Sequence, residues 1–328
     1  MYDILVIGTV TKDVFLKSGD FQVVKDDRFR TGRAGCFVLG TKLTIPQVAM
    51  ASGGGGTNVA VGLARQGFKV GCAGRVGDDS IAKEIIEEMK EEKVELLFTI
   101  DKKRNTAYST ILVSPDGERT ILEYRGANEY MSENDIDWKD LKSKWVYIDS
   151  ISGNIELLEY ILDWAKKNSV RVVFNPDQKL IRMGKDIYKY IERADIFIAN
   201  EDEYALITEI EHSEEKEEKI FKEIRNIAKD IIVMTKGPRG VVVADKKNIY
   251  SAGVPDSLVV DRTGAGDAFG SGFVSGYIQS GGDMESAIQL GIANATSVAK
   301  YFGTKNGLLK KNDRSDYNKV EIKIYKIV

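Results

Sequence analysis

Histidine and cysteine are nearly absent from this 328-residue chain, which contains one histidine and two cysteines. With only Cys36 and Cys72, the sequence has no disulfide framework and no cysteine-rich zinc site. The single histidine, His212, lies in a run of charged residues. We therefore predict a solvated side chain there and exclude histidine-based catalytic triads and histidine-rich metal sites. The scarcity of cysteine favours a reducing, cytoplasmic location.

Long apolar runs and an excess of basic residues are also missing. The sequence has no stretch of 18 apolar residues, so we expect no transmembrane helix. Residues 1–8 predict a strand rather than a signal peptide, because they lack a basic segment before the apolar one. A net charge of −3 disfavours a nucleic-acid-binding protein. The expected partners are small molecules, with no nucleic acid and no membrane.

Short apolar strands alternate with helical patterns along most of the chain. This alternation predicts an α/β fold with a mainly parallel sheet covered by helices on both faces. The predicted strands are residues 2–8, 69–74, 145–148, 171–174, 195–198 and 231–234, and the helices between them are 80–92, 155–168, 186–193 and 214–229. Two further helices are expected at 265–279 and 283–301, and the tail at 320–327 predicts a half-buried strand without an assigned partner.

Two segments break this alternation. Residues 12–50 contain no helical period and predict short strands at 14–16, 36–39 and 43–45. Residues 106–124 predict a hairpin, because Asp-Gly within the turn Pro115–Glu118 is a strong hairpin signal. We predict one domain over 1–328 with a small β lid built from insertions at about 12–50 and 99–126. Such a lid could close over a pocket and exclude water, or be an edge sheet without that function.

The segment from Asp261 to Asp267 carries the strongest chemical signal. An apolar strand, Leu258–Val260, is expected to lead through a glycine turn into a helix. The backbone N–H groups of Gly264, Ala265 and Gly266 can then converge on an anion at the helix N-terminus. A carboxylate beside such an anion site, here Asp267, suits phosphoryl transfer to a hydroxyl. The alternative is that Asp267 only complements the helix dipole.

A second glycine-rich segment, Gly53–Asn58, precedes a helix predicted over Val59–Gln66. Four successive glycines allow a ligand to approach the backbone closely. Asn58 offers donors and an acceptor suited to sugar hydroxyls, although a flexible linker with a helix cap is equally compatible. Asp13 lies just beyond the first strand, where ligands gather in open α/β sheets.

Two further segments follow predicted strands. Asn200–Glu203 could hold a hydrated Mg²⁺ or simply begin a helix. Thr235–Gly240 could cradle nucleotide phosphates or form an ordinary glycine turn. The sequence contains no P-loop motif, and no Gly-x-Gly-x-x-Gly opens the first helix, so a dinucleotide-binding fold is disfavoured.

The order of these motifs resembles that of the ribokinase-like carbohydrate kinases, also called the phosphofructokinase-B (PfkB) group. The resemblance covers residues 2–307 and depends mainly on Gly53–Asp79 and Asp261–Gly272. It implies a doubly wound α/β core with a β-sheet lid, and an ATP-dependent kinase that phosphorylates a ribose- or fructose-like sugar. Asp267 would be the general base, and the anion hole would consist of Gly264, Ala265 and Gly266.

The same resemblance assigns the binding residues. The sugar would be bound by Asp13, Gly54, Gly55 and Asn58. The nucleotide and its Mg²⁺ would be bound by Asn200, Glu203, Thr235, Gly237, Gly240 and Asn294, with Glu203 acting on Mg²⁺ through water. Asp261 and Thr263 fall where some relatives supply oxygen ligands to a monovalent cation, which adds K⁺ to the expected cofactors ATP and Mg²⁺.

Several alternatives remain open from the sequence. A nucleoside kinase of the same family could stack a base on the lid residues Phe15, Phe29 and Phe37. A sugar-phosphate kinase could bind the substrate phosphate through Arg28, Arg30, Arg33, Lys42 and Arg104. A non-catalytic sugar- or nucleotide-binding regulator would be expected to lack Asp267 or the glycine turn, and both are intact. Exposed strand edges on the lid predict a homodimer that pairs through this sheet.

Overall fold

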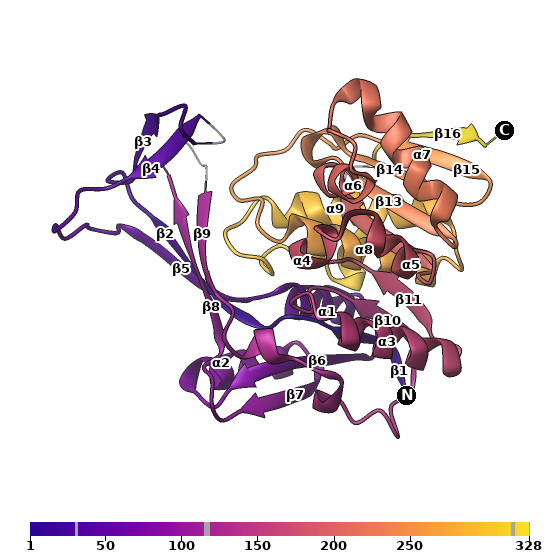
Figure 1. Cartoon of the computed structure of the whole chain (residues 1–328), viewed down its shortest axis with the longest axis horizontal. Coiled ribbons are helices and arrows are strands. Elements are labelled where there is room, and N and C mark those ends of the chain that lie inside the picture. Colours follow the sequence, from indigo (N-terminus) through magenta and orange to yellow (C-terminus); the bar gives the residue numbers. More distant parts are fainter. Residues whose placement is uncertain (30–31, 115–118, 316–318, 328) are drawn as a thin grey trace.

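The computed structural model describes residues 1–29, 32–114, 119–315 and 319–327. Its main body is an α/β core built on a ten-stranded sheet, from which a separate four-stranded lid sheet projects (Figure 1). This architecture confirms the predicted fold class. Within the described residues, no helix has the length and apolar character needed to cross a membrane.

The central sheet has the order β16-β15-β14-β13-β12-β11-β10-β1-β6-β7. In this order, adjacent strands from β13 through to β7 are parallel. At the other edge, β14, β15 and β16 each pair antiparallel with the strand before them in the chain. The strands are β1 (Tyr2–Ile7), β6 (Val70–Gly77), β7 (Glu95–Asp101), β10 (Ser143–Ile148), β11 (Arg171–Phe174), β12 (Ile196–Asn200), β13 (Ile231–Thr235), β14 (Val241–Ala244), β15 (Asn248–Ala252) and β16 (Ile322–Lys326).

Helices cover both faces of this sheet, and strand side chains alternate between the two resulting cores. In β10, Trp145 and Tyr147 join one core while Val146 and Ile148 join the other. The first core is covered by α1 (Gly55–Arg65), α2 (Ser80–Glu91), α8 (Ala265–Gln279) and α9 (Met284–Val298). The second is covered by α3 (Ile155–Lys167), α4 (Gln178–Ile181), α5 (Tyr188–Ile191), α6 (Glu201–Thr208) and α7 (Glu217–Ile227).

The order of the strands reverses at β1. From β1 the chain continues to β6 and β7 on one side, and then returns to β10 on the other side. Ligands of doubly wound folds bind outside the carboxyl ends of the strands at such a switch point. We therefore expect a ligand to bind near the residues that follow β1 and β10, namely Gly8 and Asp149.

The lid sheet has the order β5-β2-β8-β9. Its strands are β2 (Thr11–Lys17), β5 (Gln47–Gly53), β8 (Ala107–Val113) and β9 (Arg119–Tyr124), while β3 (Gln22–Lys25) and β4 (Arg33–Cys36) form a hairpin at its far end (Figure 1). Phe15, Ile111 and Val113 form its small buried core. The predicted hairpin of β8 and β9 is confirmed, and its turn, Pro115–Glu118, lies outside the described residues.

Several sequence expectations are wrong in detail. Leu258–Val260 forms no strand: Leu258 is 77% exposed, and the N–H of Val260 donates to the carbonyl of Ala299 at the end of α9, 2.8 Å away. Residues 43–45 are not a strand either, and β4 ends at Cys36. The helix expected at 186–193 is a short 3₁₀ turn followed by α5. The strand expected in the tail at 320–327 is confirmed as β16, which pairs with β15, but it is mostly exposed rather than half-buried.

Short 3₁₀ helices complete the structure. They are η1 (Gly126–Tyr130), η2 (Glu133–Asp135), η3 (Gly184–Ile187), η4 (Glu214–Lys216), η5 (Gly237–Arg239) and η6 (Lys311–Ser315). The helix expected at 214–229 is divided between η4 and α7.

Candidate active site

The glycine run at the start of α1 packs directly against two carboxylates. A Cβ atom at Gly53 would lie 1.9 Å from Oδ2 of Asp13, and one at Gly55 would lie 1.6 Å from Oδ1 of Asp149. Gly54 caps the helix with φ = +87°, a conformation that favours glycine. The helix therefore begins at Gly55 rather than at Val59, the predicted start.

Asp267 lies in the first turn of α8 and is held by the first turn of α1. The side-chain amide of Asn58 donates to Oδ2 of Asp267 at 2.7 Å, and Thr304 Oγ1 donates to Oδ1 of Asn58 at 2.7 Å. Burial raises the pKa of Asp267, while the Asn58 hydrogen bond and the charge of Lys305 act in the opposite direction. Two helix N-termini thus fix one carboxylate.

Two other acidic side chains share this region. Burial raises the pKa of Asp13 to about 6, opposed by the charge of Lys305 and a hydrogen bond from Ser109. Asp149 is buried, and burial together with the charge of Asp267 raises its pKa well above the usual range. We call Asp13, Asn58, Asp149 and Asp267 the polar cluster.

Asp149 is a functional candidate that the sequence analysis missed. Its Oδ1 accepts from the N–H of Ser150 at 2.6 Å, whereas its buried Oδ2 has no hydrogen-bond partner among the described residues. A buried carboxylate oxygen without a partner is costly and suits a group that binds a polar ligand. Asp149 directly follows a predicted strand, so the rule that selected Asp13 could have selected it too.

The turn before α8 has the geometry of an anion site. Gly264 has φ = +76°, and a Cβ atom there would lie 2.7 Å from Cβ of Thr304. The first N–H groups of a helix lack partners within the helix and point at its N-terminus. Ala265 is an exception, because its N–H donates to the carbonyl of Arg262 at 3.2 Å. Of the three predicted N–H groups, this one is already engaged.

On the other side of this turn lies an open cleft of about 580 Å³, which we call the apolar cleft. It brings together four predicted nucleotide-binding residues, Asn200, Thr235, Gly237 and Gly240, and two residues of the predicted anion hole, Ala265 and Gly266. Its remaining wall is largely apolar and includes Val254, Val259, Phe269, Ile292 and Ala295. The cleft therefore combines a glycine-lined backbone surface with an apolar surface suited to a flat ring.

Asn294 does not join these residues. It is 1% exposed, and its amide group donates to the carbonyl of Ala268 at 2.7 Å and accepts from the N–H of Leu309 at 2.8 Å. Its side chain links α9 to α8 and to the segment after α9. The prediction that Asn294 lines the nucleotide site is not supported, because the packing of α8 on α9 buries its polar atoms.

Asn200 and Glu203 form a capping box at the start of α6. Glu203 Oε2 accepts from the N–H of Asn200 at 2.8 Å, and Asn200 Oδ1 accepts from the N–H of Glu203 at 2.9 Å. The other carboxylate oxygen of Glu203 accepts from Gln178 Nε2 at 3.2 Å. Because both oxygens of Glu203 already accept hydrogen bonds, this carboxylate fits a hydrated Mg²⁺ better than a directly bound ion.

The residues predicted to bind a monovalent cation are close together but already paired. Oδ1 of Asp261 accepts from the N–H and the hydroxyl of Thr263, at 2.9 and 2.7 Å. Arg119 of β9 reaches the same oxygen at 3.4 Å. A cation here would have to share Asp261 with an arginine, so the donor set does not favour K⁺, and its requirement stays a prediction.

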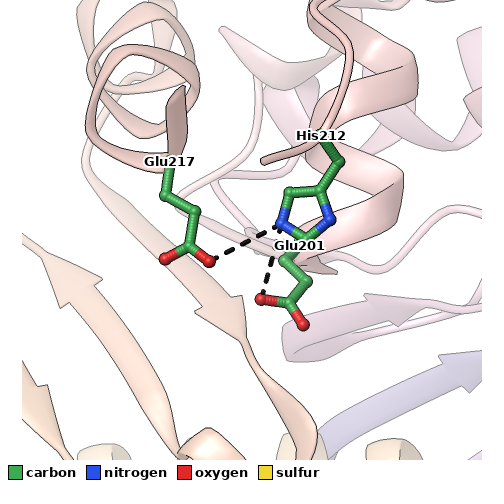
Figure 2. A group of neighbouring side chains, drawn as sticks. All are labelled: Glu201, His212 and Glu217. Atoms are coloured by element: carbon green, nitrogen blue, oxygen red, sulfur yellow. Dashed lines mark ion pairs between the residues drawn. The ribbon is translucent and has the colours of Figure 1, made fainter. Parts of the chain in front are cut away.

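His212 is not the solvated residue that we predicted. Its side chain is 27% exposed and lies beside Glu201 and Glu217, with Nε2 at 3.8 and 3.6 Å from the nearest carboxylate oxygens (Figure 2). These carboxylates also pair with cations of the turn that borders the apolar cleft. Arg239 contacts both, and Lys236 Nζ lies 2.6 Å from Glu217.

This charge network anchors the turn rather than forming an evident metal site. A metal ion held by His212 and the two glutamates would compete with Arg239 for the same carboxylate oxygens. In its present arrangement, the network connects η5 to α6 and α7.

The lid residues that could bind a nucleoside or a sugar phosphate differ in their exposure and in their partners. Phe15 is buried in the lid core and is unavailable for stacking, whereas Phe29 and Phe37 are about half exposed. Arg28 pairs with Asp26, and Arg104 lies over the ring of Tyr130. Arg30 lies outside the described residues.

Comparison with known proteins places this geometry in a family. The chain is 27% identical over 278 residues to the deoxyribokinase of Salmonella typhimurium, covering 81% of this chain and 87% of that protein. It is 26% identical over 307 residues to the cytidine kinase of Thermococcus kodakarensis, covering 92% and 98%.

Similarity in three dimensions extends over the same length. The ribokinase from Cryptococcus neoformans, solved in complex with ADP, superposes with a TM-score of 0.76 at 22% identity, covering 95% of this chain and 98% of that one. A model of the pfkB family carbohydrate kinases matches residues 30–311. The chain therefore belongs to the pfkB family of carbohydrate kinases, enzymes that transfer a phosphoryl group to a sugar hydroxyl.

Proposed function

We propose that this protein is an ATP-dependent sugar kinase that phosphorylates a hydroxyl of a ribose- or fructose-like sugar, with Asp267 as general base. One observation carries the proposal: Asn58 holds Asp267 at 2.7 Å, next to the glycine turn that borders the apolar cleft. A carboxylate in this position can take a proton from an acceptor on one side while a phosphoryl group approaches from the other.

The polar cluster binds the sugar in this proposal. Asp13, Asn58 and Asp149 offer hydrogen-bonding atoms to its hydroxyl groups. The absence of side chains at Gly54 and Gly55 lets Thr9 and Asp149 pack closely against the start of α1. Asn58 engages Oδ2 of Asp267, which leaves Oδ1 to take the proton. The acceptor oxygen forms the new bond to the γ-phosphorus as its proton passes to Asp267, and the bond between that phosphorus and ADP breaks on the opposite side.

The apolar cleft binds ATP. Phe269, Ile292 and their apolar neighbours contact the base, and Gly237 and Gly240 allow the phosphates to approach the turn after β13. The turn before α8 stabilises the negative charge of the transferring group through backbone N–H dipoles. Glu203 and Asn200 would hold hydrated Mg²⁺, which supplies positive charge to the phosphates when bound. Closure of the lid excludes water as a competing acceptor.

The test is an activity screen with a matched variant. ADP formation from ATP and Mg²⁺ is measured with ribose, fructose, other hexoses, 2-keto-3-deoxygluconate, sugar phosphates and nucleosides. Asp267→Asn keeps the size of the side chain and removes the base. Loss of a general base typically lowers kcat by about 10²–10⁴-fold, and we expect a loss of this size with unchanged thermal unfolding. Near-wild-type turnover by Asp267→Asn would overturn the role of Asp267.

A nucleoside kinase is the second candidate. The similarity to a cytidine kinase covers 92% of this chain, and the half-exposed rings of Phe29 and Phe37 on the lid could stack on a base. Turnover on nucleosides alone would establish this candidate in place of the sugar kinase. The absence of turnover on every acceptor would instead favour a binding protein without catalysis.

The lid also supports the proposal of a homodimer. The edge strands β5 and β9 expose Val48, Met50, Ile121, Leu122 and Tyr124, each at least 49% accessible. A second copy of this sheet would cover these side chains and the strand edges. Sedimentation velocity distinguishes the dimer from a monomer.

A further inference from the structure

Lys305 is a buried lysine whose role is not explained by the proposed mechanism. It lies in the loop after α9 and is only 5% exposed. Its Nζ donates to the carbonyl and the hydroxyl of Ser52 at 2.6 and 2.7 Å, and to Oγ1 of Thr57 at 2.9 Å. All three N–H groups of the ammonium are therefore engaged.

The two partners of Lys305 flank the glycine run that begins α1. Ser52 precedes Gly53, and Thr57 follows Gly56 and donates back to the carbonyl of Gly53 at 2.7 Å. Lys305 thus connects both ends of the backbone segment on which Asp13 and Asp149 pack. A shift of this segment would move both carboxylates.

The preceding residue, Thr304, contacts the same segment next to Asp267. Its hydroxyl donates to Asn58, which holds Asp267, and its Cβ fills the space that a side chain at Gly264 would need. Two consecutive residues of one loop therefore contact the start of α1 and the turn before α8. Among the contacts given above for the described residues, no other loop joins the start of α1 to the turn before α8.

The ammonium also brings a positive charge into a region of acidic groups. The titratable groups that interact with it are Glu88 of α2, Asp13 of β2, Asp267 of α8 and Cys72 of β6. Glu88 is linked to it through Ser52, whose hydroxyl donates to Oε1 of Glu88 at 2.6 Å. The direct contacts of Nζ are neutral oxygens, and the carboxylates act across them.

We propose that Lys305 is a positioning residue for phosphoryl transfer. Its ammonium group holds the glycine run at the start of α1 in the conformation that places the polar cluster, and its charge favours the ionised form of Asp267. This inference rests on the proposed function, because it assigns Lys305 to the proton transfer that Asp267 performs.

The energetics of burial support a functional role. Burying a charged ammonium is unfavourable, and methionine could fill a similar volume without that cost. Burial lowers the pKa of Lys305 from 10.5 to about 8, opposed by Glu88, Asp13, Asp267 and Cys72. The side chain is then mostly charged at neutral pH and becomes neutral in weakly alkaline solution.

The experiment compares Lys305→Met, Lys305→Gln and the surface control Lys300→Met with the wild type. Methionine removes the charge and the donors, whereas glutamine keeps two donors without the charge. The steady-state parameters for the best acceptor are measured from about pH 6 to about pH 9.5. ADP affinity is measured by calorimetry, and thermal unfolding is followed for each variant.

We expect kcat to fall roughly 10- to 100-fold in Lys305→Met. The acid limb of its pH profile should move to higher pH, because Asp267 loses a nearby cation. The alkaline limb caused by Lys305 should disappear, and ADP affinity and thermal stability should be maintained. Lys305→Gln should show the same shift of the acid limb, and Lys300→Met should match the wild type.

Three outcomes separate this inference from the proposed function. If Asp267→Asn retains wild-type activity, the proposed function fails, and the inference fails with it. If Asp267→Asn is inactive but Lys305→Met keeps the wild-type kcat and pH profile, only the inference fails. The inference is also overturned if Lys305 variants lose kcat and stability together without moving the acid limb, because the residue then contributes only packing.

Discussion

The polar cluster and the apolar cleft flank the same helix N-terminus but are built in opposite ways. In the polar cluster, Asp13, Asn58 and Asp149 are buried, and Asn58 connects Asp267 to Thr304. In the apolar cleft, an open space of about 580 Å³ is bordered by turns, glycines and apolar side chains. The charged residues that line it are Arg119, Asp256 and Arg262, whereas Arg239 and Lys236 of the turn at its border pair with glutamates.

This difference matches two kinds of ligand. A sugar presents hydroxyl groups in all directions, so its site must supply many polar atoms whose own burial is costly without a partner. A nucleotide base presents a flat ring, which gains binding energy from burial against apolar side chains. The polar cluster therefore requires exact preorganisation by neighbouring groups, whereas the apolar cleft tolerates an open geometry.

The largest effect is expected when a glycine beside the polar cluster and a glycine beside the apolar cleft are each replaced by alanine. Gly55→Ala places a Cβ atom 1.6 Å from the carboxylate of Asp149 and should displace it, whereas a Cβ atom at Gly266 meets nothing within 4 Å. We expect Gly55→Ala to lower kcat/KM for the acceptor by about 10²–10³-fold, the range seen when a reacting group is misplaced. Gly266→Ala should change mainly the KM for ATP. Equal acceptor kinetics in the two variants would contradict a role for Asp149 in sugar binding.

A second effect concerns stability and depends on the buried charge of Lys305 beside the polar cluster. The pKa of Lys305 is lowered from 10.5 to about 8 in the folded protein. Between these values the unfolded chain binds more protons than the folded one, so raising the pH stabilises the fold. From about pH 7 to about pH 10, the free energy of unfolding of the wild type should rise by about 2 kcal/mol relative to Lys305→Met. Urea unfolding at both pH values measures this difference, and parallel curves would show that burial does not lower the pKa of Lys305.

The smallest expected effect sharpens the description of the apolar cleft. Ile292 is 3% exposed, lies in the core covered by α1, α2, α8 and α9, and borders the apolar cleft. Ile292→Gln therefore replaces an apolar contact with a polar group. We expect KM for ATP to rise about tenfold, which corresponds to about 1.4 kcal/mol of lost apolar contact, with little change in KM for the sugar. Ile155→Gln on the surface of α3 is a matched control, since Ile155 is 37% exposed. An increase in the sugar KM instead would show that the two sites are not separate.

Local sequence signals identified much of the fold and of the site. A glycine turn and a helix N-terminus lie close together in the chain with a polar side chain, Asn58 in one segment and Asp267 in the other, and these two side chains meet in the structure. Asp13 was selected because it follows the first strand, where ligands bind in open α/β sheets, and its role in binding stays a prediction. The helix α8 begins at Ala265 and ends at Gln279, as its run of small and apolar residues predicted.

Other predictions failed because the deciding partner is far away in the sequence. Leu258–Val260 has strand-forming residues, but the end of α9 occupies its hydrogen bonds. Asn294 was assigned to the nucleotide by the family resemblance, and the packing of α8 against α9 engages its amide group, so its role stays a prediction. His212 lies in a charged run, but the fold brings Glu201 and Glu217 beside it (Figure 2).

The sequence by itself determined most of the strands and helices, the glycine turns and the type of chemistry, because these depend mainly on residues within a few positions of one another. Only the tertiary structure decided which carboxylates meet. It brought Asn58 to Asp267 and Lys305 to Ser52, pairs that are 209 and 253 residues apart. Such contacts depend on how the helices pack on the sheet, and the free energy of a buried charge depends on every group that surrounds it. No local pattern contains that information.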